Sequence, residues 1–193
     1  MSISITTSNE IFENKQNLII IFSAFSGEIE SITKENYVFI YGNNELVGIN
    51  IFNYKEDFKD ISEGYHSFSD LNFNKISKKF PTEMKNVKNN SFFKTGLIEN
   101  IENHPKSEKL KILSVKINNE TLPIVTNLDN LKPGDYHLFA TNKAFLATGM
   151  VITESKVMGS ESKGMICSYK SLGIVKEGII KIDNKNKLEE YTF

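Results

Sequence analysis

One decapeptide decides how the second half of the chain is interpreted: GSESKGMICS, residues 159–168. Its glycines and serines are typical of a turn, and the apolar residues that follow indicate a short strand entering a core. A second motif, HPKSEKL at residues 104–110, lies upstream. Proline restrains the residue before it to extended geometry, so this motif predicts a turn after which Leu110 returns to the core.

The composition is that of an ordinary globular protein. The chain has 193 residues, 39% of them apolar, which suits one large domain or two small ones. No apolar run approaches the roughly 20 residues that cross a bilayer, and the N-terminal residues lack a leader pattern. We therefore expect a cytoplasmic protein with no membrane partner. Cys167 is the single cysteine, so neither a disulfide nor a zinc site, nor any other cofactor, is expected.

The charge is nearly balanced but unevenly distributed. All 23 basic residues are lysines, and the formal net charge is -1. Residues 1–90 carry 9 Lys against 12 acids, whereas residues 91–173 carry 10 Lys against 8 acids. Any nucleic-acid contact must therefore use lysine point charges instead of the bidentate guanidinium of arginine. The mildly basic middle segment is a weak indication of such contacts.

The first part of the chain predicts a small α+β domain, residues 1–88. Residues 18–22 form a β-branched run typical of a buried strand. Residues 37–41 and 46–52 flank a Gly-Asn-Asn-Glu loop and predict a β-hairpin.

A helix is expected to follow in this domain. The helical pattern begins at Asp70, the expected N-cap, and extends loosely to about Lys88, and Pro81 should end or interrupt the helix. The polar residues 82–91 suggest an exposed linker. His66 is interpreted as a surface loop residue, and no catalytic set is recognisable.

The second part, residues 91–193, predicts an all-β domain. The sequence suggests five short strands separated by turn signals, at residues 93–100, 110–117, 122–126, 136–140 and 151–153. Five such strands fit a small closed barrel. Residues 177–183 predict an extra strand that could close the barrel or pair with a second chain, so a homodimer is possible.

Both motifs carry a family resemblance. Residues 104–110 resemble the His-Pro-x-Ala/Ser-x-Lys-Leu motif, and residues 159–168 the Gly-Val-Glu-Ser-x-Gly-Met-Leu-Cys-Ser motif, of the tRNA-binding domain in bacterial phenylalanyl-tRNA synthetase β chains. The resemblance extends over residues 92–174 and implies an oligonucleotide-binding (OB) barrel. The whole chain is similar to short bacterial YtpR-like proteins, which place a small N-terminal domain before this barrel.

The resemblance also implies site residues. Ser162 and Met165 match positions implicated in holding RNA, where a hydroxyl can donate to a phosphate or 2′-hydroxyl and a thioether can lie against a base. Lys156 matches a lysine that could contact a phosphate. The other candidate contacts are Lys163, Lys109 and Asn142. Each also has a structural interpretation, as does His104, and Cys167 is expected to pack in the core.

The chain departs from the family where charge matters most. Met158 replaces a usual arginine, and the basic run expected at residues 151–154 is absent. Each missing cation should weaken RNA binding and flatten its salt dependence. Phe139, Phe145 and Tyr169 are candidate stacking platforms that could equally belong to the core.

These observations favour a non-enzymatic, two-domain RNA-binding protein. Its expected partner is tRNA, with an aminoacyl-tRNA synthetase or translation factors as further partners. The alternative is a protein-interaction or dimerisation module whose OB barrel has lost most of its RNA affinity. An unrecognised enzyme in the N-terminal domain is the least favoured interpretation.

Overall fold

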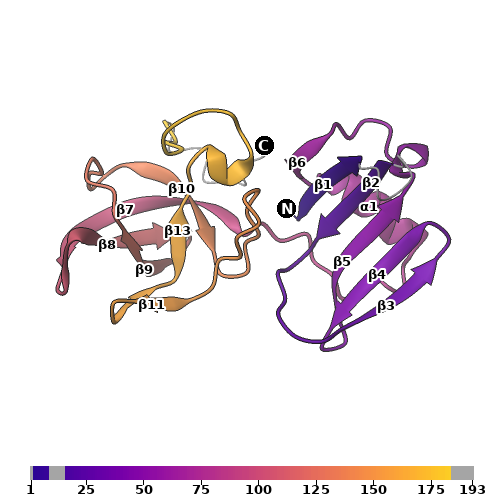
Figure 1. Ribbon diagram of the computed structural model, residues 1–193, viewed down its shortest axis with the longest axis horizontal. Helices are drawn as coiled ribbons and strands as arrows, with labels where there is room; N and C mark the ends of the chain where they lie inside the picture. The colour runs from indigo at the N-terminus through magenta and orange to yellow at the C-terminus, as the bar shows by residue number, and fades with distance from the viewer. Residues whose placement is uncertain (1, 9–15, 184–193) are drawn as a thin grey trace. The chain divides into compact units, whose positions relative to one another are not determined.

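The computed structural model describes residues 2–8 and 16–183. The chain divides into two compact units, with the division between Ser91 and Phe92. Both are built mainly from β-strands (Figure 1). Among the described residues, none of the helices has the length and apolar character that a membrane span requires.

The N-terminal unit is a six-stranded antiparallel sheet in the order β3-β4-β5-β2-β1-β6. Its strands are β1 (Ile3–Ser8), β2 (Gln16–Ile21), β3 (Ile29–Lys34), β4 (Tyr37–Gly42), β5 (Glu45–Phe52) and β6 (Gly64–Ser67). The helix α1 (Asp70–Lys79) and the 3-10 turn η2 (Tyr54–Glu56) complete it. Side chains of β2, β4 and β5 form the core with Ile76 of α1 and with Phe80.

The predicted hairpin is confirmed as β4 and β5, with Gly42 paired to Glu45. Asn43 and Asn44 between them have φ values of 50° and 64°, the backbone that a type I′ turn requires. The predicted strand at residues 18–22 is confirmed as β2, which ends one residue earlier, at Ile21.

Helix α1 differs from the prediction at its N-terminus, whereas its predicted end at Pro81 is confirmed. Its N-cap is Ser69, whose hydroxyl accepts a hydrogen bond from the Asn72 N–H, so Asp70 is the first helical residue and not the cap. The helix ends at Lys79, because the residue before Pro81 is disfavoured from helical geometry. The predicted linker is also wrong in part, since Met84 is buried in the core.

One charged cluster ties α1 to the sheet. The buried Tyr37 hydroxyl donates to the Asp57 carboxylate, and the Lys79 ammonium lies 3.0 Å from the same carboxylate. Lys79 also lies over the Tyr37 ring, 4.6 Å from its centroid. The hydrogen bond from Tyr37, with further help from Lys79, lowers the pKa of Asp57 against the effect of its partial burial.

The C-terminal unit contains a five-stranded antiparallel sheet in the order β13-β10-β7-β8-β9 and a two-stranded ribbon, β11-β12. The bounds are β7 (Phe93–His104), β8 (Ser107–Ile117), β9 (Glu120–Thr126), β10 (Tyr136–Thr141), β11 (Ser155–Val157), β12 (Ser160–Ser162) and β13 (Gly164–Ile166). A 3-10 turn, η3 (Lys170–Leu172), follows. The register of β7 against β8 shifts at Ile98/Asn100 and again at Asn103/His104.

Four of the five strands predicted for this unit are confirmed, while the fifth is wrong. Val151 forms only an isolated bridge with Phe145. Strands β11 and β12 were not predicted, whereas β13 is the short strand expected after the glycine-serine turn of the decapeptide. Strands β13 and β9 stand at opposite ends of the ladder order, so the described pairings give an open order of strands and not a closed barrel.

The predicted strand at residues 177–183 pairs within its own unit. Ile180 N–H donates to Cys167 O at 2.9 Å, and Ile182 N–H donates to Tyr136 O at 2.9 Å. The contacts are isolated bridges that place this segment between β10 and Ser168.

Candidate nucleic-acid interface

The decapeptide begins inside a tight hairpin. Val157 of β11 pairs with Ser160 of β12, which leaves Met158 and Gly159 as a two-residue loop. Their φ values of 49° and 95° are both positive, as in a type I′ turn. Glycine adopts this backbone freely, whereas a methionine there is strained by about 1–2 kcal/mol. The Met158 side chain is nevertheless 54% exposed at the tip of the hairpin.

His104 joins the upstream motif to this hairpin. The imidazole is buried, with Nε2 lying 3.1 Å from Val157 O. The backbone N–H of Lys106 donates to Nδ1 at 3.1 Å. Since Nδ1 accepts, the proton of the neutral ring belongs on Nε2, where it donates to Val157. His104 therefore has a structural role, and its side chain holds the upstream motif to the hairpin in which the decapeptide begins. Leu110, which was expected to return to the core, is only partly buried.

Lys106 is a functional candidate that the sequence prediction missed. A Cβ atom added to Gly159 would lie 3.2 Å from the Lys106 Nζ, so this ammonium sits directly against the hairpin loop. Lys106 occupies the variable position of the motif, between Pro105 and Ser107, and its neighbour Gly159 is distant in the sequence. A lysine inside the predicted turn was the feature of the sequence that could have identified Lys106 as a candidate contact.

Two hollows lie on the surface beside these motifs. The larger, of about 600 Å³, is at the turn between β7 and β8, and its lining comprises Asn103, His104, Pro105, Lys106, Ser107, Glu108 and Lys111. The smaller, of about 190 Å³, is beside the β11-β12 ribbon and is lined by Glu154, Ser155, Lys156, Glu161, Ser162 and Lys163.

Lysines and glutamates alternate around both hollows. Lys106 and Lys156 are exposed, and Lys163 is half-buried. Within residues 2–8 and 16–183, no carboxylate forms an ion pair with any of the three. Lys156 lies opposite Glu161 across the ribbon. The surface can therefore offer ammonium groups to an anion, but its own carboxylates reduce the local potential.

Ser162 is used inside the protein. It is only 4% exposed, and its hydroxyl donates to Gly164 O and accepts from Val125 N–H, both at 3.1 Å. The neighbouring Lys163 N–H donates to Pro123 O at 2.9 Å. These bonds fix the corner between β12 and β13 against β9. Ser162 thus shapes the smaller hollow, and its hydroxyl hydrogen already has a protein acceptor.

The remaining predicted contacts are more scattered. Met165 on β13 is half-buried and pairs with Ala140, while Asn142 follows β10 in a turn. Thr141 pairs with Gly164 at one end of the β10-β13 pair. Asn142, which follows Thr141, and Lys163, which precedes Gly164, therefore lie at the same end of this strand pair. Lys109 is exposed on β8 but lines neither hollow.

Cys167 and Phe139 belong to the core, whereas Tyr169 contacts a lysine. Cys167 is fully buried, and burial raises the pKa of its thiol to about 12, so it packs as expected and is not a reactive thiolate. Phe139 is also fully buried and cannot be a stacking platform. The Lys176 ammonium lies over the Tyr169 ring, 4.2 Å from the ring centroid.

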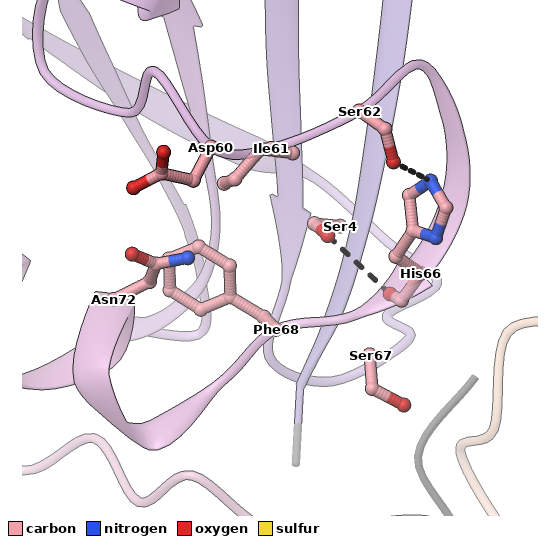
Figure 2. Close-up of a pocket in the computed structure, with 8 residues that line it drawn as sticks. All are labelled: Ser4, Asp60, Ile61, Ser62, His66, Ser67, Phe68 and Asn72. Carbon is pink, nitrogen blue, oxygen red and sulfur yellow. Dashed lines mark hydrogen bonds between the residues drawn. The ribbon is translucent and has the colours of Figure 1, made fainter.

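A polar pocket of about 230 Å³ lies among the described residues of the N-terminal unit. This pocket bears on whether the unit could be an enzyme. Figure 2 shows Asp60 and Asn72 at one end and Ser62 and His66 at the other. His66 lies on β6, so its assignment to a loop is wrong. Its Nε2 is 3.1 Å from Ser62 Oγ and 2.9 Å from Glu63 O. A proton donated to Glu63 would prevent Nε2 from accepting the Ser62 proton, which disfavours a nucleophile–base pair.

The described residues contain no group of three or more His, Cys, Asp or Glu side chains positioned to hold a metal ion. The polar side chains that line the two hollows of the C-terminal surface are lysines, glutamates, serines, an asparagine and the buried His104. The lysines and hydroxyls among them can donate hydrogen bonds to an anionic ligand.

Comparison with known proteins gives a consistent result. The family described as "Putative tRNA binding domain" matches residues 93–189. The chain is 40% identical over 97 residues to the phenylalanine–tRNA ligase beta subunit of Campylobacter jejuni, a match that covers 49% of this chain and 12% of that protein. It is 37% identical over 82 residues to "Putative tRNA-binding protein YtpR" of Bacillus subtilis, covering 42% and 41% of the two chains.

A solved structure also shows similarity. The MetRS related protein from Pyrococcus horikoshii is 26% identical, with a TM-score of 0.35, over 48% of this chain and 81% of that one. In both curated comparisons, the matched segment spans less than half of the relative's own length. The family match covers both motifs, the hairpin and the two hollows. The chain therefore belongs to the tRNA-binding domain family, through its C-terminal unit.

Proposed function

We propose that the C-terminal unit binds structured tRNA through the surface formed by the β7-β8 turn and the β11-β12 ribbon, without catalysis. The observation that carries this proposal is the link through His104, which brings Lys106 to the ribbon that bears Lys156. A ribbon and a turn held in fixed geometry can follow a folded phosphate backbone. Family membership supports tRNA as the class of ligand.

The residues would divide the work by charge and exposure. Lys156, Lys106 and Lys163 are proposed to contact phosphates, with Lys109 as an outlying cation. Met165 and Asn142 would meet sugar or base edges beside Lys163. Ser162 would position the ribbon corner, since both of its hydrogen bonds are made within the protein.

We further propose that this unit is an OB-type barrel. The bonds from Val125 to Ser162 and from Lys163 to Pro123 bring the corner before β13 to β9, although these strands end the ladder order. Such contacts would close the barrel without a continuous ladder. We also propose residues 1–88 and 91–193 as the two domains of the chain, which the division into compact units near Ser91 supports. The cytoplasmic location stays a prediction.

The affinity is expected to be modest. The surface uses lysines without arginine, and Glu108, Glu154 and Glu161 lie among them. Weak, salt-sensitive binding suits a protein that retains or delivers tRNA for a synthetase or a translation factor. The alternative is a protein-interaction module, which the buried Ser162 hydroxyl and these carboxylates favour.

A titration of bulk tRNA at about 50 mM and about 200 mM salt tests the proposal. Removal of one phosphate contact should weaken binding about tenfold at the lower salt and reduce the slope of log K against log salt by about one. We expect this of Lys156→Glu and Lys106→Glu. Lys132→Glu, at an exposed lysine in the turn before β10, is the matched control.

Two results would reject the proposal. The first is no binding at the lower salt. The second is equal weakening by Lys156→Glu and Lys132→Glu, because the surface would then act only through its overall charge. Either result would favour the protein-interaction alternative.

A further inference from the structure

Strand β3 is an exposed edge of the N-terminal sheet. It stands at the end of the strand order, and Figure 1 shows it at the outer side of that sheet. All six of its residues are exposed, including Ile29 at 61% and Ile32 at 50%. A long edge strand with exposed apolar side chains is a template for pairing with another strand. The opposite edge, β6, has four residues.

Ile32 continues the core face of the sheet. It lies opposite Phe39 of β4, which is fully buried in the core. Residues on one strand alternate between faces, so Glu30 and Lys34 lie on the same face as Ile32. The apolar face thus extends one strand beyond its covering, with an acidic residue on one side of Ile32 and a basic residue on the other.

We propose that β3 pairs antiparallel with β3 of a second copy of the chain, around a two-fold axis at Ile32. In an antiparallel sheet, every second residue of an edge strand directs its backbone N–H and C=O groups to the open edge. In a symmetric dimer, the two residues that lie opposite each other must therefore both have even numbers or both have odd numbers. The register centred on Ile32 places Ile32 against Ile32. The same register places Glu30 opposite Lys34 at both ends.

The neighbouring registers are poorer. An axis at Ser31 would place Glu30 opposite Ile32, and an axis at Thr33 would place Ile32 opposite Lys34. Opposite charges across a pair of strands stabilise it, whereas a charge opposite an apolar side chain does not. Lys34 already bonds to Glu83 of its own chain, so Glu30 of the partner would add a second carboxylate to this ammonium.

The pairing of two short strands buries less than the roughly 1,200 Å² typical of a tight complex. We therefore expect a concentration-dependent dimer with a dissociation constant on the order of 10 μM. The inference does not rest on tRNA binding, because it concerns a unit outside the family match, which begins at residue 93.

Sedimentation velocity of the full chain tests the pairing, at concentrations from about 1 to about 200 μM. Glu30→Lys should weaken the dimer at least about tenfold, because like charges then meet at both ends. Lys34→Glu should do the same. An equimolar mixture of the two variants should dimerise again, since each end of the mixed dimer regains one opposite-charge pair. Glu45→Lys, at an exposed position in the same sheet, is the matched control.

Hydrogen exchange keeps the test independent of the variants. Amides of β3 in the unmodified chain should exchange more slowly at high concentration than at low concentration. A chain that stays monomeric, a dimer that is indifferent to Glu30→Lys, no association in the mixture, or exchange in β3 independent of concentration would each overturn the proposal. If the chain is monomeric, the partner of the β3 edge would be a different protein.

Discussion

His104 is the residue on which the geometry of the candidate surface depends most. Both of its ring nitrogens are used, one toward Val157 and one from Lys106. Removal of the ring leaves a buried carbonyl and an N–H without these partners. Such groups typically cost about 1–3 kcal/mol.

His104→Ala should therefore lower both the free energy of unfolding and the affinity for tRNA. Urea denaturation and tRNA titration would measure the two effects. His66→Ala, at a partly buried histidine of the other unit, should leave the tRNA affinity unchanged. Full tRNA affinity in His104→Ala would show that the ribbon does not need its link to the turn.

His137 provides a pH-dependent contribution of known sign. It is 2% exposed, with Nδ1 lying 3.2 Å from Ile180 O, and burial lowers the pKa of its imidazole below the usual 6.5. The unfolded chain then binds the proton more readily, so the folded state loses stability as the pH falls below about 6.5. His137→Gln should reduce this loss between about pH 7 and about pH 5. Identical pH profiles of the free energy of unfolding would contradict the assignment.

Single residues were predicted unevenly from the sequence. The packing of Cys167 and the structural role of His104 followed from their types and neighbours. The burial of the Ser162 hydroxyl did not, because its partners, Val125 and Gly164, are brought to it by the fold. Lys106 was missed for the same reason, since its neighbour Gly159 is distant in the sequence.

Among the elements, the β11-β12 ribbon gives the sharpest prediction. Its two loop residues have positive φ, but one of them is a methionine. Gly159→Ala should destabilise the unit by about 1 kcal/mol, since alanine is strained there and its methyl group would meet Lys106. Met158→Gly should change stability by less, or increase it. Thermal unfolding would measure both, and a more stable Gly159→Ala variant would contradict the loop geometry.

Elements with a strong periodic pattern were predicted correctly, including β2, the β4-β5 hairpin and β7 to β10. Strands β1 and β3 were missed, because β1 is rich in Ser and Thr and β3 is exposed on both faces. Three-residue strands such as β11 and β12 are too short to show a period. The Ser69 cap was missed because Asp70, beside it, is an equally good capping type.

For the whole molecule, the two units carry different inferences. The C-terminal unit holds the family match and the lysine surface, whereas the N-terminal unit carries the exposed β3 edge. A dimer through β3 would join two of the proposed tRNA-binding surfaces in one particle. Such linkage can raise the apparent affinity of weak sites when one ligand reaches both. This would compensate for the missing cations that the sequence predicted and for the glutamates that lie among the lysines of the two hollows.

The salt dependence of tRNA binding tests the proposed surface most directly. Replacing Lys106, Lys156 and Lys163 together by Gln removes three proposed phosphate contacts. The slope of log K against log salt should then fall by about two to three. A matched variant with Lys94, Lys116 and Lys132 replaced by Gln should keep the slope of the unmodified chain. Equal slopes in all three proteins would contradict the placement of tRNA on this surface.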